Sequence, residues 1–316
     1  MNTPVVGQVL VLFFLMAVGF FCFKLKITTK EASALFSSFV MKLTLPCMIF
    51  NSFRRPFGWG LLGEAAAVLG ISTAICGLSY LISLAYPHLL GMKGPERGVH
   101  RYALVISNCG LIGYPMINVI LGPEYIFHAV IFTIPFSFLA FSVAAWFIAR
   151  EGPRTEGSKA PVFSWKVLLN PPLVSTAIGL VFFLFSIPLP KSLETGIKLI
   201  GDITSPLSMI VIGMTIAQAE IKHILGRWRV YVTVLMRLLL LPALAGLFCY
   251  LVRIRGPLQV LSVILIAMPA GSTTSILASV YDVAEEEAGS IVALSTILCA
   301  LTIPLVVIAV NHYFGG

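Results

Sequence analysis

The sequence has little charge for its length. Only 11% of its 316 residues are charged and 58% are hydrophobic, whereas a soluble domain carries about 25% charged residues. This composition excludes a disordered chain and an ordinary soluble enzyme. It predicts a protein that crosses a membrane several times.

Motifs for catalysis and cofactor binding are also missing. None of the six cysteines has CxxC spacing, and neither GxxxxGK[ST] nor HExxH occurs. The sequence therefore predicts no enzyme activity, no metal site and no cofactor. The net charge of +8 lies in short clusters between apolar stretches, so membrane topology explains it better than nucleic-acid binding does.

A membrane-spanning helix needs about 20 mostly apolar residues. Ten such stretches predict an all-α polytopic membrane protein with ten transmembrane helices. The predicted spans, numbered 1 to 10 in order, are Pro4–Phe23, Ala32–Phe53, Trp59–Tyr86, Val99–Leu121, Tyr125–Ala149, Trp165–Ser186, Ser192–Ala219, Arg229–Val252, Leu258–Tyr281 and Ala288–Tyr313.

The basic residues predict how these spans are oriented. Odd-numbered loops hold 13 of the 21 Lys and Arg residues and even-numbered loops hold 5, so the odd loops are expected to be cytoplasmic. Both termini then lie outside, in a protein of the cell (plasma or inner) membrane. The ninth loop departs from the trend because it carries Asp282 and Glu285–Glu287 but no basic residue.

The two halves of the chain share their spacing. Pro46 and Pro206 are 160 residues apart, and Gly110 and Gly271 are 161 apart. Because each half has five spans, the second half enters the membrane with the opposite topology, as in inverted-repeat transporters. The predicted parts are a first five-helix repeat (1–149), a cytoplasmic central loop (150–164) and a second, inverted repeat (165–316).

Spans 4 and 9 are corresponding members of the two repeats, and both contain helix-breaking residues. Span 4 reads S-N-C-G-L-I-G-Y-P and span 9 reads M-P-A-G-S-T-T-S. A single break more often serves packing, but paired breaks indicate a binding site where half-helix N-termini attract an anion. The candidate substrate-binding residues are Asn108, Cys109, Gly110, Gly113, Pro115, Pro269, Gly271, Ser272, Thr273 and Thr274.

These motifs carry a resemblance to a known family. Asn108, Gly113 and Pro115, followed by Pro269-Ala270-Gly271 in the second half, resemble the auxin efflux carrier family. This family includes plant PIN-type carriers and bacterial permeases for malonate and similar acids.

The resemblance implies a fold shared with bile-acid and sodium–proton transporters, with broken helices 4 and 9 crossing. Helices 1, 2, 6 and 7 would form a scaffold that dimerises, and helices 3–5 and 8–10 would form a transport domain that moves as an elevator. Asn108 would contact the substrate, Gly110 and Gly113 would permit unwound backbone, and Pro115 and Pro269 would end half-helices.

Ionisable residues within spans are functional candidates because charge is costly in lipid. Lys42 and Asp202 each precede a repeat proline by four residues, so we expect them to neutralise each other. The alternatives are a cavity-facing charge pair, a proton-coupling site, or two residues that never meet. Lys198, four residues before Asp202, competes for the same partner.

Three further residues lie nearer the span ends. Arg237 is expected to extend towards the interface, with an anion contact as the alternative. Glu64 is expected to reach water, and the resembled family has a functional acid at a similar place. His128 is expected to be a hydrogen-bonded interface residue rather than a ligand.

The predicted function is a secondary active or potential-driven transporter of a small organic anion, a carboxylate or auxin-like acid. The alternatives are a dicarboxylate importer coupled to H⁺ or Na⁺, such as a malonate permease, and, from other classes, a channel or an intramembrane enzyme. The expected partners are the anion, the lipid bilayer and a second copy of the chain, bound through helices 1, 2, 6 and 7.

Overall fold

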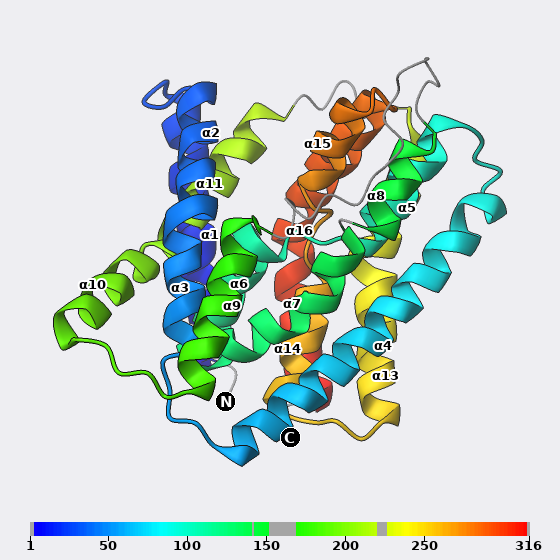
Figure 1. Ribbon diagram of the computed structural model, residues 1–316. Helices are drawn as coiled ribbons and strands as arrows, with labels where there is room; N and C mark the ends of the chain where they lie inside the picture. The colour runs from blue at the N-terminus through cyan, green and yellow to red at the C-terminus, as the bar shows by residue number, and fades with distance from the viewer. Residues whose placement is uncertain (1–2, 141, 152–168, 220–225, 315–316) are drawn as a thin grey trace. The chain divides into compact units, whose positions relative to one another are not determined.

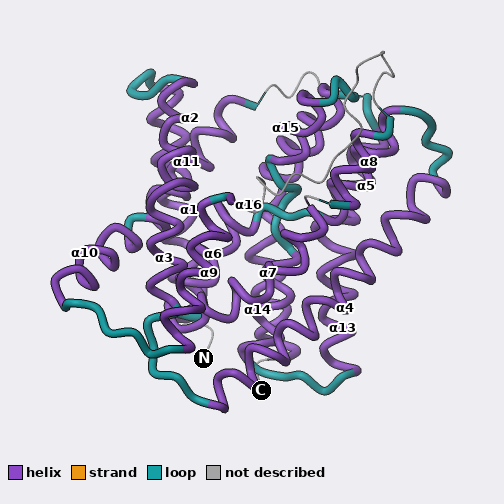
Figure 2. Tube along the Cα trace, in the orientation of Figure 1, coloured by secondary structure: helices purple, strands orange, loops and turns teal. Residues whose placement is uncertain are grey.

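The computed structural model describes residues 3–140, 142–151, 169–219 and 226–314. Within these ranges the chain consists of helices and connecting loops, with one isolated β-bridge (Figure 2). Most of the predicted central loop, 150–164, and the start of predicted span 6 lie outside the described residues.

Within the described residues, helices lie in each apolar stretch, and several stretches are divided into shorter helices (Figure 1). The first half contains α1 (Thr3–Lys24), α2 (Lys30–Phe39), η1 (Val40–Thr44), α3 (Leu45–Ser52), α4 (Trp59–Leu89), α5 (Pro95–Val105), η2 (Cys109–Gly113), α6 (Tyr114–Ile120), η3 (Pro123–Tyr125), α7 (Ile126–Ala140) and α8 (Val143–Ala149). The second half contains α9 (Pro171–Leu184), α10 (Lys191–Asp202), α11 (Thr204–Gln218), α12 (Trp228–Leu235), η6 (Met236–Leu240), α13 (Leu241–Leu251), α14 (Pro257–Ile266), α15 (Thr273–Val280) and α16 (Glu285–Phe314).

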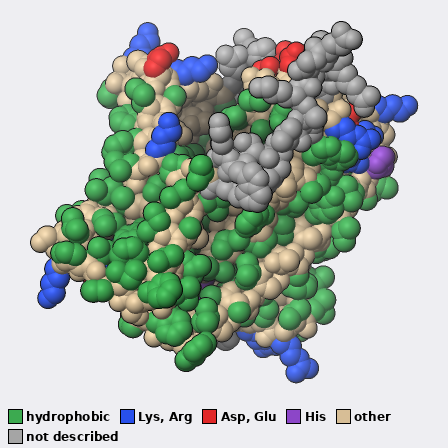
Figure 3. All heavy atoms as spheres, viewed as in Figure 1, with side chains coloured by type: hydrophobic (Ala, Val, Ile, Leu, Met, Phe, Trp, Pro, Cys, Tyr) green, Lys and Arg blue, Asp and Glu red, His purple; other side chains and the backbone are tan. Residues whose placement is uncertain are grey.

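The helices have the length and surface that a membrane requires. Among the described residues, six helical stretches are long and apolar enough to cross a bilayer, and four shorter apolar helices accompany them. Large side chains such as Phe14 and Leu301 are each 66% exposed, and hydrophobic side chains cover much of the visible surface (Figure 3). A surface of this kind needs lipid around it, so the chain is a polytopic helical membrane protein.

The chain forms two compact units. Unit 1 comprises residues 1–68, 109–131 and 165–219, and unit 2 comprises 69–108, 132–164 and 220–316. The chain passes between the units at Asn108, in the middle of predicted span 4. Unit 1 therefore includes α1, α2, α3, α6, α9, α10 and α11, and unit 2 includes α5, α8 and α12–α16.

Three five-residue π-helical turns, η1, η2 and η6, share one cause. Each is followed at once by an α-helix whose second residue is a proline: Pro46, Pro115 or Pro242. Proline lacks an N–H donor and its ring collides with the carbonyl four residues earlier, so the preceding turn widens. Two of these turns hold a charged side chain, Lys42 in η1 and Arg237 in η6.

Helices α5 and α14 in unit 2 begin in the same way. Each follows a glycine with positive φ, Gly94 at 67° and Gly256 at 75°, and each has proline as its first residue. Glycine adopts this backbone conformation without strain, and proline suits the first helical position. The two start signals are 162 residues apart (256 − 94), close to the spacing of the proposed repeat.

In unit 1, α1 and α11 pack with their backbones in contact through two glycines. A Cβ atom on Gly19 would lie 2.0 Å from the carbonyl oxygen of Ile210, and one on Gly213 would lie 1.9 Å from that of Met16. Small residues permit such close helix packing in membranes.

We therefore expect Gly213→Ala to destabilise the protein by about 1–3 kcal/mol, the usual cost of overpacking. A thermal melt of the purified protein in detergent measures this. The matched control is Gly196→Ala in α10, where a Cβ would meet nothing within 4 Å and alanine should leave the melting temperature unchanged or higher. Equal melting temperatures for Gly213→Ala and the wild type would contradict the packing.

Candidate functional site

In unit 2 two interrupted helices meet at their breaks. Helix α5 ends at Val105 and α14 at Ile266, and the unwound segments that follow them pair through an antiparallel bridge between Ser107 and Ala270. The Asn108 N–H donates to the Pro269 carbonyl at 2.9 Å, and the Gly271 N–H donates to the Ile106 carbonyl at 2.9 Å. This paired backbone is called the crossing below.

Arg237 holds the C-terminal ends of both interrupted helices. Its Nη1 donates to the Leu104 carbonyl at 2.7 Å, and its Nε donates to the Met268 carbonyl at 3.1 Å. The carbonyls at a helix C-terminus lack intrahelical partners and carry partial negative charge. One guanidinium thus satisfies an acceptor in the last turn of α5 and another in the unwound segment just after α14.

The expectation that Arg237 extends to the membrane interface is wrong. The residue is 1% exposed, and its side chain points at backbone carbonyls. A buried charge of this kind is tolerated only with partners, and the interrupted helices supply them.

Two side-chain hydroxyls also hydrogen-bond to residues at or next to the crossing. Ser295 of α16 accepts a hydrogen bond from the Ala270 N–H at 3.1 Å. Tyr102 of α5 donates to the Thr273 hydroxyl at the start of α15 at 3.0 Å. The crossing is therefore bonded to η6 and α16, and α5 is bonded to α15.

Asn108 and Ser272 place polar side chains next to each other at the crossing. The Asn108 side-chain amide lies 3.4 Å from the Ser272 hydroxyl, and Ser272 is exposed. Thr274, by contrast, is fully buried. Of the predicted site residues, Asn108, Pro269, Gly271, Ser272 and Thr273 thus lie together in unit 2.

The remaining predicted residues of span 4 belong to unit 1. Their substrate-binding role stays a prediction, but the backbone conformation expected for them is wrong. The backbone is unwound at 106–108, before Gly110 and Gly113, which lie with Cys109 in the π-helical turn η2. Pro115 does not end a half-helix; it is the second residue of α6. In the second half, Pro269 lies within the unwound segment, three residues beyond α14.

The structure does not pair Lys42 with Asp202. Asp202 accepts a hydrogen bond from Lys198 at 3.0 Å, with both side chains about 60% exposed (61% and 58%). Lys42 is itself exposed. Asp202 therefore pairs with the lysine four residues earlier on α10 and not with the lysine at the repeat-related position.

Glu64 and His128 form a pair in unit 1. Their Oε2 and Nε2 atoms are 3.0 Å apart, with the Glu64 side chain 57% exposed and that of His128 6% exposed. Glu64 is therefore an exposed side chain, and His128, as expected, is a hydrogen-bonded residue.

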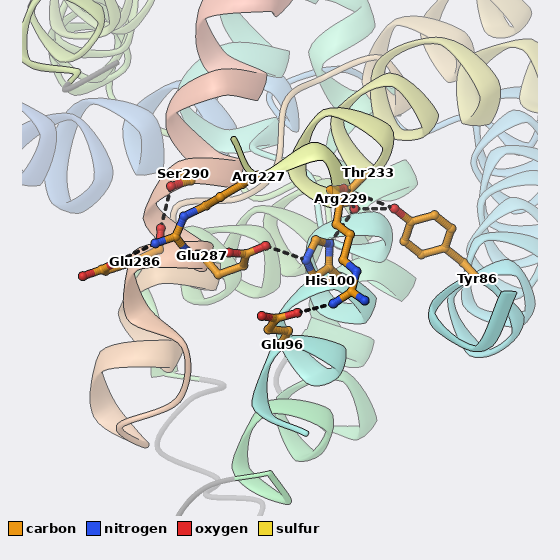
Figure 4. A network of polar contacts seen from close by, with 9 residues as sticks. All are labelled: Tyr86, Glu96, His100, Arg227, Arg229, Thr233, Glu286, Glu287 and Ser290. Carbon is orange, nitrogen blue, oxygen red and sulfur yellow. Dashed lines mark hydrogen bonds and ion pairs between the residues drawn. The ribbon is translucent and has the colours of Figure 1, made fainter. Parts of the chain in front are cut away.

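A group of charged side chains joins the ends of α5, α12 and α16 in unit 2 (Figure 4). Arg227 pairs with Glu286 and, at 2.6 Å, with Glu287, and these contacts raise the pKa of Arg227. Arg229 pairs with Glu96 at 2.9 Å. Two acids of the ninth loop thus pair with one arginine of the seventh, and the neighbouring arginine pairs with an acid of the third.

Sequence reasoning did not identify His100 and Glu287 as partners. They are 187 residues apart in the chain and meet only through packing of α5 against α16. The one available signal was the cluster of acids in a loop where basic residues were expected.

The fold and the crossing define a polytopic helical membrane protein with two interrupted helices bonded at their breaks. Residues 4–307 match the family described as membrane transport protein, and the chain belongs to this family of auxin efflux carrier-like transporters.

Two archaeal relatives extend over almost the whole chain. A protein of Methanothermobacter thermautotrophicus is 25% identical over 310 residues, covering 96% of this chain and 97% of its own length. A protein of Methanocaldococcus jannaschii is 22% identical over 304 residues, covering 94% and 96% respectively. Both are called uncharacterized transporters.

Replacement of Arg237 by alanine should destabilise unit 2, because the Leu104 and Met268 carbonyls lose their donor. Each orphaned acceptor costs about 1–3 kcal/mol, so a marked fall in melting temperature is expected. Arg255→Ala, at an exposed arginine, is the control. If both variants melt like the wild type, Arg237 does not hold the crossing.

Proposed function

We propose that the protein is a secondary transporter of a small organic anion that binds at the crossing. Membership of a transporter family supports transport. The choice of an anion rests on the chemistry of the crossing itself.

The observation that carries this proposal is the position of Arg237. Where interrupted helices meet, C-terminal ends present partial negative charge and N-terminal ends present partial positive charge. Arg237 compensates the C-terminal ends of α5 and α14, whereas the first turn of α15 contains no acidic residue. Neither unwound segment contains Asp or Glu. The N–H groups of α15 and the Asn108 and Ser272 side chains can therefore donate to a carboxylate.

The proposal includes the architecture expected for the family. Ten membrane-spanning helices form two inverted five-helix repeats, with both termini outside. The matching Gly-Pro starts of α5 and α14, and the break at the end of each, support the repeat. Helices 1, 2, 6 and 7 act as a dimeric scaffold. The presence of α1, α2, α3, α9, α10 and α11 in one compact unit supports this role, although α6, from the second half of helix 4, belongs to the same unit. Helices 3–5 and 8–10 move as the elevator.

The test is a screen of purified protein for binding and transport. Thermal shifts and currents on solid-supported membranes are measured with mono- and dicarboxylates, with sugars and organic cations as controls. We expect a saturable response to at least one carboxylate. A response to cations or sugars, with no response to any acid, would contradict the anion proposal.

Asn108→Ala should abolish the carboxylate response without unfolding the protein. The side chain makes one long contact to Ser272 at 3.4 Å, so its loss costs little stability, whereas a substrate donor is removed. Asn51→Ala, at an asparagine in α3 of unit 1, is the control for transport and melting. Normal transport by Asn108→Ala would place the substrate elsewhere.

A further inference from the structure

His100 lies at the centre of the polar network in Figure 4. It belongs to α5 and is fully buried. Its Nδ1 is 2.5 Å from the Thr233 hydroxyl of α12, and its Nε2 is 3.1 Å from a carboxylate oxygen of Glu287 in α16. One imidazole therefore joins three helices of unit 2.

The hydrogen-bonding capacity of Thr233 permits two protonation states of His100. A hydroxyl has one proton to donate and two lone pairs. It lies 2.6 Å from the Tyr86 hydroxyl and 2.9 Å from the Arg229 carbonyl, besides its contact with His100.

If Thr233 donates to His100 Nδ1, the imidazole is neutral and Nε2–H donates to Glu287. If Thr233 donates to the Arg229 carbonyl instead, it accepts from Nδ1–H, and His100 is an imidazolium paired with the Glu287 carboxylate. The network can therefore take up a proton when one hydroxyl rotates, with no heavy atom displaced. The charged form has one more internal hydrogen bond and an ion pair.

Protons can reach this pair from water. Glu287 lines a pocket of about 500 Å³ together with Lys93, Glu96, Arg227 and Glu286. The Glu287 side chain is only 7% exposed, so one side of it meets the pocket and the other meets buried His100.

Glu287 is the acid in contact with His100, and the other charged residues nearby have partners of their own. On α16, Glu286 is paired with Arg227, which also contacts Glu287. Arg229, at the start of α12, is paired with Glu96 of α5.

The other elements around α5 place their charges elsewhere. Beside α8, Glu151 pairs with Arg97, and on α4, His88 contacts Arg101. Arg237 of η6 is bonded to Leu104, at the opposite end of α5, and α15 contains no charged residue.

We propose that His100 and Glu287 form a proton-binding site, loaded from this pocket, that controls how firmly α12 and α16 hold helix α5. The proton site itself does not depend on the proposed function, but its effect on transport does. Helix α5 leads directly into the crossing, so the attachment of α5 would affect the substrate site. A proton is thus the second ligand of unit 2.

The direct test is the pH dependence of thermal stability, which requires no substrate. Histidine changes charge between about pH 5 and pH 8, and a folded state that gains contacts on taking up a proton is stabilised as the pH falls. We expect the melting temperature of the wild type to rise by a few degrees towards acid pH, relative to His100→Gln. Glutamine keeps a donor for Glu287 but cannot titrate. Glu287→Gln should lose the same acid stabilisation.

The comparison variant is His128→Gln, which removes a second histidine–glutamate pair, in unit 1. Its own effect on the pH slope is measured separately, and the acid stabilisation assigned to α5 is the part that His100→Gln and Glu287→Gln remove and His128→Gln does not. An unchanged pH slope in both His100→Gln and Glu287→Gln, or a slope that disappears only in His128→Gln, would overturn the proposal.

Transport provides the second readout. The pH profile of the carboxylate-induced current should flatten in His100→Gln and not in His128→Gln, and an unaltered profile in His100→Gln would contradict control of the carrier. The two proposals fail separately. A His100-dependent pH slope in melting without any carboxylate response refutes only the transport proposal.

Discussion

The crossing in unit 2 depends on the two hydrogen bonds from Arg237 to the Leu104 and Met268 carbonyls. An interrupted helix in lipid leaves carbonyls that water cannot reach, and each must find a partner within the protein. A charged group in the bilayer has the same need, because its insertion costs roughly 3 kcal/mol near the centre. Here the arginine and the two carbonyls satisfy each other. The π-helical turn before Pro242 carries this arginine, so a proline in span 8 takes part in the breaks of spans 4 and 9.

Helix α5 is held at both ends, and this links the two polar centres of unit 2. Its C-terminal end is bonded to Arg237 and to the opposite unwound strand. Nearer its N-terminus, His100 and Glu96 are bonded to Thr233, Glu287 and Arg229. The middle of α5 has Tyr102 bonded to α15. Both polar centres are therefore attached to the same helix of 11 residues. This is the physical basis for expecting a proton at His100 to affect an anion at Asn108.

The sequence predicted the helical stretches and the two breaks, because hydropathy and the glycine and proline pattern are local signals. Two predictions about charged side chains were wrong, because the position of a residue along a span does not say which neighbouring helix its side chain faces. Arg237 was placed at the interface, yet it turns to two helices whose breaks create its acceptors. Asp202 was assigned to Lys42 by symmetry, but Lys198 is nearer on the same helix. Gly110 and Gly113 were taken as unwound, whereas Pro115 widens their turn instead of opening it.

The most direct test of this account is a disulfide across the crossing. Ser107 and Ala270 oppose each other without bonding directly, an arrangement with Cα atoms about 4.5 Å apart, within the range of about 4.4–6.8 Å that a disulfide spans. The six native cysteines are first replaced, Ser107→Cys and Ala270→Cys are introduced, and a protease site is inserted into the predicted central loop, 150–164. After oxidation and cleavage, the two halves should migrate together on a gel until reductant is added. Halves that separate without reductant would contradict the crossing.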